Sequence, residues 1–343
     1  MPLVRVTSFF GDEPDGSKTV TSPPMALSTP WSRAMGIDVP IVNAPMGGAA
    51  GGALAAAVSR AGGLGMIGMG SSATVEQLAA ELKHVAGLER PFGIGLVHWV
   101  MAARPDLLDV ALAARPALLA VSFGAEWSWV RRAHDAGVPV AAQVADITAA
   151  RRAVEAGVDV VVARGAEGGG HGEPRLGTLP LLAEMLDEVP SPVLAAGGIG
   201  SGRGLAAVLA AGASGAWLGT AFTTCVEAST SPAARVPLLA AHGADTVTTL
   251  VFDVAQEYPW PATLPERVVC NEFVDRFDGH ERDIDAEAQT ELAAAVAEED
   301  YRLAPVNAGQ GVGLLREVRP AADVIRRLCA DAERLLGVWG GPG

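Results

Sequence analysis

Residues Val158–Glu173 read VDVVVARGAEGGGHGE, and this segment shows how the whole chain is built. Its first five residues, Val158–Val162, are apolar and β-branched apart from Asp159, which predicts a strand buried on both faces. The second half is rich in glycine, which lets a backbone approach a ligand closely, and it contains His171, which can transfer protons near neutral pH. This order is typical of an active site at the carboxyl end of a parallel strand. The alternative is a surface turn with an incidental histidine.

Short apolar strands alternate with amphipathic helices along the rest of the chain. Eight strands are expected, at Ile41–Ala44, Leu64–Met69, Phe92–Val97, Leu118–Phe123, Val138–Val144, Val158–Arg164, Val193–Gly197 and Ala216–Thr220. Eight strands with crossover helices can close into a (β/α)₈ TIM barrel or form an open doubly wound sheet. The count of eight, the even spacing and the glycine-rich strand ends favour the α/β barrel.

The helix that should follow the eighth strand is delayed. An irregular stretch rich in proline and aromatic residues (Phe252–Phe273) comes first, followed by an acidic helical segment, Ile284–Glu299. A strongly amphipathic segment that could close the barrel appears only at Pro320–Leu336. We therefore expect a barrel domain from residues 31–227 and 306–343, with residues 228–305 inserted as a cap subdomain between the eighth strand and the last helix. This cap would exclude water and shape a substrate pocket, or instead be a structural or dimerising appendage of a homodimer. Residues 1–30 are expected to form an extended N-terminal arm.

The composition argues against several classes of protein. The net charge of −14 argues against nucleic acid or an anionic membrane surface as a partner, and no apolar run has the length of a membrane span. Cys225, Cys270 and Cys329 lie far apart without a CxxC spacing, which predicts reduced thiols in a cytoplasmic protein and no metal site. The only lysines, Lys18 and Lys83, lie away from any expected strand end, so Schiff-base chemistry is not expected.

The seventh and eighth expected strands share a second feature. Each runs into a glycine turn and a helix start, in AAGGIGSGRG (Ala195–Gly204) and WLGTAF (Trp217–Phe222). In barrels, the loops after these two strands commonly bind a phosphate through backbone N–H groups and a helix N-terminus. The residues placed for this role are Gly198, Gly200, Gly219 and Thr220.

Six glycine-rich segments together carry a resemblance. They are NAPMGG (Asn43–Gly48), GGLGMIG (Gly62–Gly68), ARGAEGGGHGE (Ala163–Glu173), PVLAAGGIGSGRG, WLGTAF and AGQGVG (Ala308–Gly313). The chain resembles the nitronate monooxygenase family, formerly called 2-nitropropane dioxygenase. This resemblance implies an FMN-dependent TIM barrel with an inserted substrate domain. Flavin-dependent enoyl-acyl-carrier reductases and NADH:quinone reductases resemble the same set, so the motifs indicate the flavin barrel more strongly than the reaction.

The resemblance also implies roles for the matching residues. One group would lie near the flavin ring: Ala44, Pro45, Met46, Gly169 and Gly170. A second group would bind the FMN phosphate: Gly197, Gly198, Gly219 and Thr220. His171 would face the substrate above the ring as the catalytic base.

Three positions depart from the family pattern. Gly95, Arg164 and Trp217 stand where family members commonly have Asn, Gln and Gln. Arg164 would stabilise negative charge at the pyrimidine edge of the flavin, or instead pair with a carboxylate such as Glu167 or Asp146.

Further polar and aromatic residues could line the pocket or merely pack. Gln143 would supply a hydrogen bond to the flavin edge, or fill the barrel interior. The candidates for the substrate pocket, with packing as the alternative role, are His98, Trp99, Tyr258 and Trp260.

The favoured function is FMN-dependent oxidation of a small nitronate or nitroalkane by dioxygen to a carbonyl compound and nitrite. His171 would remove the α-proton of a nitroalkane, and desolvation among apolar and glycine neighbours would favour its neutral, basic form. One alternative is an NAD(P)H-dependent flavin reductase of a quinone or enoyl thioester. Another is a phosphate-binding barrel without flavin.

Overall fold

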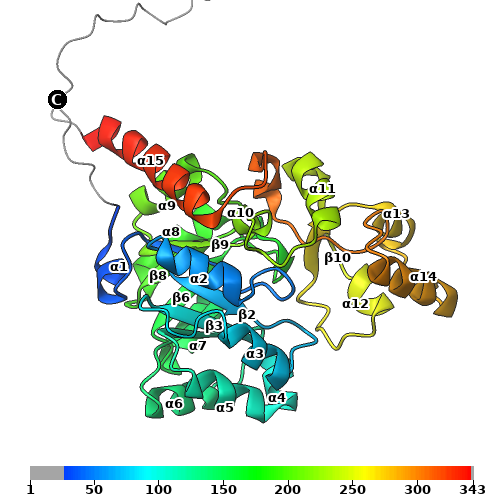
Figure 1. Cartoon of the computed structure of the whole chain (residues 1–343), viewed down its shortest axis with the longest axis horizontal. Helices are drawn as coiled ribbons and strands as arrows, with labels where there is room; N and C mark the ends of the chain where they lie inside the picture. Colours follow the sequence, from blue (N-terminus) through cyan, green and yellow to red (C-terminus); the bar gives the residue numbers. More distant parts are fainter. Residues whose placement is uncertain (1–26, 341–343) are drawn as a thin grey trace, which may run out of the picture.

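The computed structural model describes residues 27–340 of the chain, in which a barrel carries a smaller insert at one end (Figure 1). The expected arm over residues 1–30 therefore lies almost wholly outside the described residues. The last residues of that range instead lead into a helix, α1 (Pro30–Ala34), because the Thr29 side chain accepts from the Ser32 N–H and caps the first turn.

Eight parallel strands form the barrel, as the sequence predicts. They are β1 (Ile41–Asn43), β2 (Gly65–Gly68), β3 (Phe92–Val97), β4 (Leu118–Ser122), β5 (Val140–Val144), β6 (Val160–Arg164), β8 (Val193–Ala196) and β9 (Gly215–Leu218). Each begins and ends within two residues of its predicted position. Their spatial order is β1-β9-β8-β6-β5-β4-β3-β2, and a parallel bridge from Val42 to Leu64 closes the ring.

The closure between β1 and β2 depends on the buried side chain of Asn43. Its Nδ2 donates to the Met66 carbonyl at 2.9 Å, and its Oδ1 accepts from the Met66 N–H at 2.9 Å. Both polar atoms of this side-chain amide are hydrogen-bonded, so the amide adds two bonds to the pairing of β1, a strand of only three residues. It fixes the point at which the next residues, Ala44–Met46, leave the carboxyl end of the barrel.

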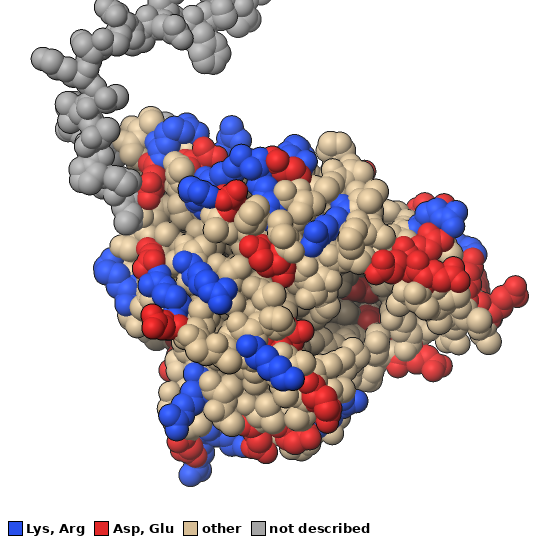
Figure 2. All heavy atoms as spheres, in the orientation of Figure 1, with Lys and Arg blue, Asp and Glu red and all other residues tan. Residues whose placement is uncertain are grey.

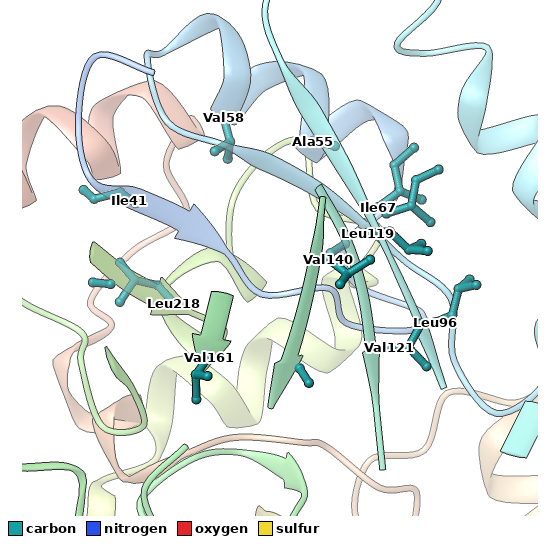
Figure 3. Packing of buried hydrophobic residues seen from close by; sticks show 14 of the residues in the cluster. Ile41, Ala55, Val58, Ile67, Leu96, Leu119, Val121, Val140, Val161 and Leu218 are labelled. Carbon is teal, nitrogen blue, oxygen red and sulfur yellow. The ribbon is translucent and has the colours of Figure 1, made fainter. Parts of the chain in front are cut away.

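Helices cover the outside of the barrel. They are α2 (Gly52–Arg60), α3 (Val75–Leu82), α5 (Pro105–Ala113), α6 (Ser128–Asp135), α7 (Ile147–Glu155), α8 (Thr178–Glu188), α9 (Gly202–Ala210) and α15 (Ala321–Gly340). Strand residues such as Ile67, Val140 and Val161 pack into the apolar layer beneath these helices (Figure 3). The delayed helix α15 packs against α9 and α2 and completes the ring. None of the helices in residues 27–340 is long and apolar enough to cross a membrane.

A second apolar core fills the barrel interior. It includes Val42, Met66, Val160 and Leu194 from the strands, and Trp31 from the preceding helix α1. Trp31 lies against Gly215, the first residue of β9, and so closes the amino-terminal end of the barrel. Only the carboxyl ends of the strands are left to hold a ligand.

Residues 228–305, called the insert below, contain more regular structure than expected. The sequence suggested an irregular stretch followed by one acidic helix at Ile284–Glu299. The structure has α11 (Pro232–Ala240), β10 (Thr246–Thr249), α12 (Val251–Ala255), β11 (Glu266–Val269) and α13 (Glu272–Phe277) before the acidic helix, α14 (Ala286–Ala297). A separate apolar core that includes Phe252, Phe273 and Leu292 holds α12, β11, α13 and α14 together.

A two-residue strand, β7 (Gly170–His171), joins the insert to the barrel. It pairs antiparallel with β11, so that Glu266 lies opposite His171 and Arg267 lies opposite Gly170. The glycine loop after β6 is therefore held in a fixed register with the insert.

Candidate active site

A cavity of about 790 Å³ opens where the carboxyl ends of the barrel strands meet the insert. This volume lies within the range of small-molecule sites. All the residues predicted to contact a flavin or its phosphate line it: Ala44, Pro45, Met46, Gln143, Arg164, Gly169, Gly170, Gly197, Gly198, Gly200, Gly219 and Thr220. Figure 2 shows the hollow between the barrel and the insert.

The turns after β8 and β9 form one end of this cavity, called the phosphate cradle below (Gly197, Gly198, Gly219 and Thr220). Gly197 and Gly198 have φ angles of +114° and +66°, which glycine adopts readily. Among residues 27–340, the amide N–H groups of Gly198, Gly219 and Thr220 have no hydrogen-bond acceptor. Unpaired amides around a glycine-lined space suit a phosphate group.

Gly95 stands where an Asn is expected from the family pattern, and the structure gives a steric reason for the glycine. A Cβ atom on Gly95 would lie 2.2 Å from the Pro45 Cβ, so no larger residue fits while Pro45 keeps its position. A Cβ atom on Gly68 would similarly lie 2.1 Å from the Met46 backbone nitrogen. These two glycines let the segment 44–46 pack closely on β2 and β3, where it forms the cavity floor.

Arg164 pairs with neither Glu167 nor Asp146, which corrects one of the two predictions for it. Its Nη2 donates to the carbonyls of Gly168 at 2.8 Å and Gly170 at 2.9 Å. The proposed partners are engaged elsewhere, since Glu167 accepts from the start of α8 and Asp146 pairs with another arginine. Burial lowers the pKa of Arg164 to about 10, so the guanidinium remains charged at neutral pH. Arg164 shapes the glycine loop that leads to His171.

His171 lies at the junction of the barrel and the insert. Its Nε2 is 3.0 Å from each carboxylate oxygen of Asp253, a buried residue of α12. In the neutral tautomer that donates Nε2–H to this carboxylate, Nδ1 has the lone pair. Trp260 stacks on the imidazole, with centroids 3.7 Å apart and planes at 9°. The sequence predicted only apolar and glycine neighbours for His171. The structure adds the carboxylate of Asp253, which fixes the ring.

A second buried carboxyl group, Glu266, faces the same histidine. Burial and the charge of Asp253 raise the pKa of Glu266 to about 8, so it is uncharged at neutral pH. The donor atoms of His171, Asp253 and Glu266, called the buried trio below, lie within 4.8 Å of one another. This spacing would also admit a metal ion, although the sequence predicted no metal site.

His98 and Trp99 do not line the cavity, which corrects their predicted role. They begin α4 (His98–Ala103), a helix that the sequence pattern did not predict. His98 packs against Gly124, and Trp99 contacts Trp260 edge-on with centroids 5.7 Å apart. Trp99 therefore supports the pocket wall from behind. The other two candidates for the substrate pocket, Tyr258 and Trp260, do line the cavity.

A family model described as nitronate monooxygenase matches residues 28–115 and 97–331. The chain belongs to the nitronate monooxygenase family. It is accordingly a flavin-dependent oxidoreductase, and its barrel, cradle and glycine loop agree with that assignment.

Three relatives show how far the similarity extends. A nitronate monooxygenase of Pseudomonas aeruginosa is 32% identical over 354 residues, which cover 88% of this chain and 98% of the relative. The (3aS,4S,5R,7aS)-5-hydroxy-7a-methyl-1-oxo-octahydro-1H-indene-4-carboxyl-CoA dehydrogenase of Mycobacterium tuberculosis is 33% identical over 262 residues, covering 75% of this chain and 70% of the relative. The solved structure of nitroalkane oxidase from Streptomyces ansochromogenes has a TM-score of 0.76 at 29% identity, covering 90% of this chain and 100% of that one. The chain is thus similar in sequence to enzymes that are named for different substrates.

Asp253 and Glu266 are the residues of this family member's site that the sequence did not indicate. Asp253 follows His171 by 82 positions, and no motif connects the two. One signal was available, because VFDVA places a single carboxylate within an apolar run where a solvated acid is not expected. Glu266 gives no comparable signal, since it is one acid among many in the insert.

Proposed function

We propose that this flavin-dependent oxidoreductase uses FMN to oxidise small nitroalkanes and their nitronates with dioxygen, giving a carbonyl compound and nitrite. The observation that carries the proposal is the position of His171, held by Asp253 and Trp260 at the wall of the cavity. A fixed imidazole with one free basic nitrogen is suited to remove a proton next to a nitro group. The Pseudomonas relative, named for this activity, supports the same reaction.

The residues present fit FMN. The unpaired amides of the phosphate cradle would bind a single phosphate, and the segments 44–46 and 169–170 would contact the ring. The one G-x-G-x-x-G match in the described residues, Gly63–Gly68, ends in strand β2 and not at a strand-to-helix turn, so it does not form the site for the adenosine half of a dinucleotide, which favours FMN over FAD. When bound, FMN supplies the electron acceptor that reacts with dioxygen.

Two members of the buried trio, His171 and Asp253, would carry out the proton chemistry. His171 would accept the α-proton at Nδ1, while its Nε2–H stays bonded to Asp253, whose charge stabilises the imidazolium that forms. Trp260 keeps the ring in plane and, with Tyr258, excludes water from the proton-transfer site. General-base catalysis of this kind contributes about 10²–10⁴-fold to a rate.

Replacing His171 with Asn tests this assignment, because Asn keeps a hydrogen-bonding group and removes the basic nitrogen. The variant His171→Asn should retain flavin and lose turnover of neutral nitroalkanes by about a hundredfold or more. Nitronates arrive already deprotonated, so their turnover should fall much less. The measurement compares initial rates with the neutral nitroalkane and with its nitronate, at matched flavin content.

The exposed His280 of the insert provides a matched control, since His280→Asn should change neither rate. Equal losses of nitroalkane and nitronate turnover in His171→Asn would mean that this residue positions the substrate and does not accept its proton. Unchanged rates would remove His171 from the reaction.

A second candidate function is favoured by the similarity to the Mycobacterium tuberculosis CoA-ester dehydrogenase. In that case the enzyme would be an NAD(P)H-dependent flavin reductase of a quinone or an enoyl thioester. Anaerobic reduction of the flavin by NADH or NADPH, seen as bleaching of its visible absorption, would favour this reaction over nitroalkane oxidation. A protein that takes up no flavin would point instead to a phosphate-binding barrel without flavin.

A further inference from the structure

Two buried carboxyl groups of the insert lie close together in the wall of the cavity. Asp253 and Glu266 are 5% and 4% exposed, and their oxygens lie within 4.8 Å of each other and of a ring nitrogen of His171. Two carboxyl groups this close in a buried site do not readily ionise at the same time. One of the two therefore holds a proton near neutral pH.

The surroundings of the pair indicate which carboxyl group holds the proton. Both oxygens of Asp253 lie 3.0 Å from the His171 Nε2, a donor that stabilises the ionised form. Glu266 interacts instead with the uncharged side chain of Asn307, and this hydrogen bond only partly offsets the other effects. Burial, and then the charge of Asp253, raise the pKa of Glu266 to about 8. Glu266 is thus the protonated member of the pair.

The pairing of β11 with β7 places this uncharged acid beside the base. Glu266 lies directly opposite His171 in the two strands, and both side chains line the cavity. Arg267, the next residue of β11, points to the other face of the strand, where it donates to the Ala166 carbonyl. Within the described residues, the titratable groups that face Glu266 are accordingly His171 from β7 and Asp253 from α12.

Removal of the α-proton from a nitroalkane creates negative charge on the nitro group. The C–H bond breaks, its proton passes to the His171 Nδ1, and its electron pair forms a C=N bond while a nitro oxygen takes the charge. A hydrogen-bond donor directed at that oxygen lowers the barrier, because the charge develops in the transition state. An ionised carboxylate cannot donate, whereas a protonated one has an O–H.

Two other donors near His171 are already engaged. The Trp260 Nε1 donates to the Ser71 hydroxyl at 3.1 Å, and the Arg164 Nη2 donates to two carbonyls of the glycine loop. The O–H of Glu266 is within reach of a nitro group, because that group is attached to the carbon that His171 would deprotonate.

We propose that Glu266 is a second catalytic residue of this site, which donates its carboxyl O–H to a nitro oxygen while His171 accepts the α-proton. This inference rests on the proposed function for the reaction itself. Glu266 keeps its proton throughout, so it stabilises the developing charge and does not act as an acid. The same hydrogen bond would bind a nitronate that arrives already deprotonated.

Two substitutions of Glu266 test the hydrogen bond on the holoenzyme. Gln keeps a donor in place of the O–H, whereas Met has a similar volume and no donor. At pH 7, Glu266→Met should lower kcat/KM for a neutral nitroalkane at least about tenfold, since loss of one such donor commonly costs about 10²–10³-fold in rate. Glu266→Gln should remain within about twofold of the wild type, because the hydrogen bond is kept.

Glu298→Met is the matched control for these variants. Glu298 is an exposed acid of the insert that does not line the cavity, so its substitution should leave kcat/KM unchanged. All rates are expressed per bound flavin, which corrects for any loss of folded protein. Equal losses in Glu266→Met and Glu266→Gln would overturn the assignment.

The pH dependence provides a result that a purely structural role would not give. Glu266 donates while it is uncharged, and it loses this ability as the pH rises through about 8. With a nitroalkane diluted from a neutral stock just before mixing, wild-type kcat/KM should fall between about pH 7 and pH 9. Glu266→Gln cannot ionise and should show no such fall. An identical fall in both proteins would contradict the proposal.

Binding of propanoate separates this inference from the proposed reaction. Propanoate resembles a nitronate, because two oxygens share one negative charge, but it is not oxidised. Its dissociation constant at pH 7, read from changes in flavin absorption, should rise at least about tenfold in Glu266→Met and stay near the wild-type value in Glu266→Gln. If no nitro compound is oxidised but propanoate follows this order, the reaction fails and the hydrogen bond holds. If nitro compounds are oxidised and Glu266→Met changes neither rate nor binding, the hydrogen bond fails and the reaction holds.

Discussion

The two ends of the cavity are built from different parts of the chain. The phosphate cradle consists of backbone from two consecutive strand–helix units, after β8 and β9. The buried trio consists of side chains from three elements, β7, α12 and β11, which are joined through the insert. The first end therefore comes with the barrel fold, whereas the second exists only because the insert docks in one register. This difference suggests that the barrel determines the cofactor and the insert determines the reaction.

The comparison predicts that proton transfer can be lost without loss of the flavin, and Asp253→Asn should show the largest effect. The amide has the shape of the carboxylate, but it has no charge and can donate to Nε2, which would move the imidazole proton to Nδ1. We expect nitroalkane turnover to fall by about a hundredfold or more, since a base in the wrong tautomer cannot accept a proton. Initial rates measure nitroalkane turnover, and visible absorption measures the bound flavin.

Asp278→Asn is the matched control for that variant. Asp278 is an exposed acid of the insert, and it does not line the cavity. Its substitution should leave both rate and flavin content unchanged. A large loss of flavin in Asp253→Asn would show that the buried trio also affects flavin binding at the phosphate cradle.

For Gly197→Ala we predict the opposite result, weaker flavin binding without loss of proton transfer. Gly197 has a φ of +114°, and a Cβ atom there would lie 2.7 Å from the Thr178 hydroxyl oxygen. Backbone strain of about 1–3 kcal/mol corresponds to a flavin affinity roughly tenfold to a hundredfold weaker. Equilibrium titration with FMN measures this affinity, and turnover per bound flavin should change little. Gly279→Ala, at φ +76° in the insert, controls for strain away from the cradle, and flavin affinity unchanged by Gly197→Ala would contradict the cradle assignment.

The same difference explains how much could be predicted from the sequence. The cradle residue Thr220 was predicted because strand, glycine turn and helix start follow one another locally. Glu266 could not be predicted, because it lies opposite His171 only through the pairing of β11 with the two-residue strand β7, and strands this short show no clear alternation. His98 was misplaced for a related reason, since it follows a strand but begins a helix that turns it towards Gly124.

The smallest predicted effect concerns Glu266, whose replacement by Gln should leave the reaction at neutral pH almost unchanged. Burial and Asp253 raise its pKa from the ordinary 4.5 to about 8. Between these two values the folded protein keeps a proton that the unfolded chain has lost, so Glu266 lowers stability progressively as pH rises through this window. Gln cannot ionise, so Glu266→Gln should nearly match the wild type at pH 4.5 and exceed its stability at pH 8.5 by roughly 4–5 kcal/mol. Urea unfolding at the two pH values, with flavin saturating, measures the difference. A variant that is less stable at pH 8.5 would mean that Glu266 works as an anion, held by a cation bound within the buried trio.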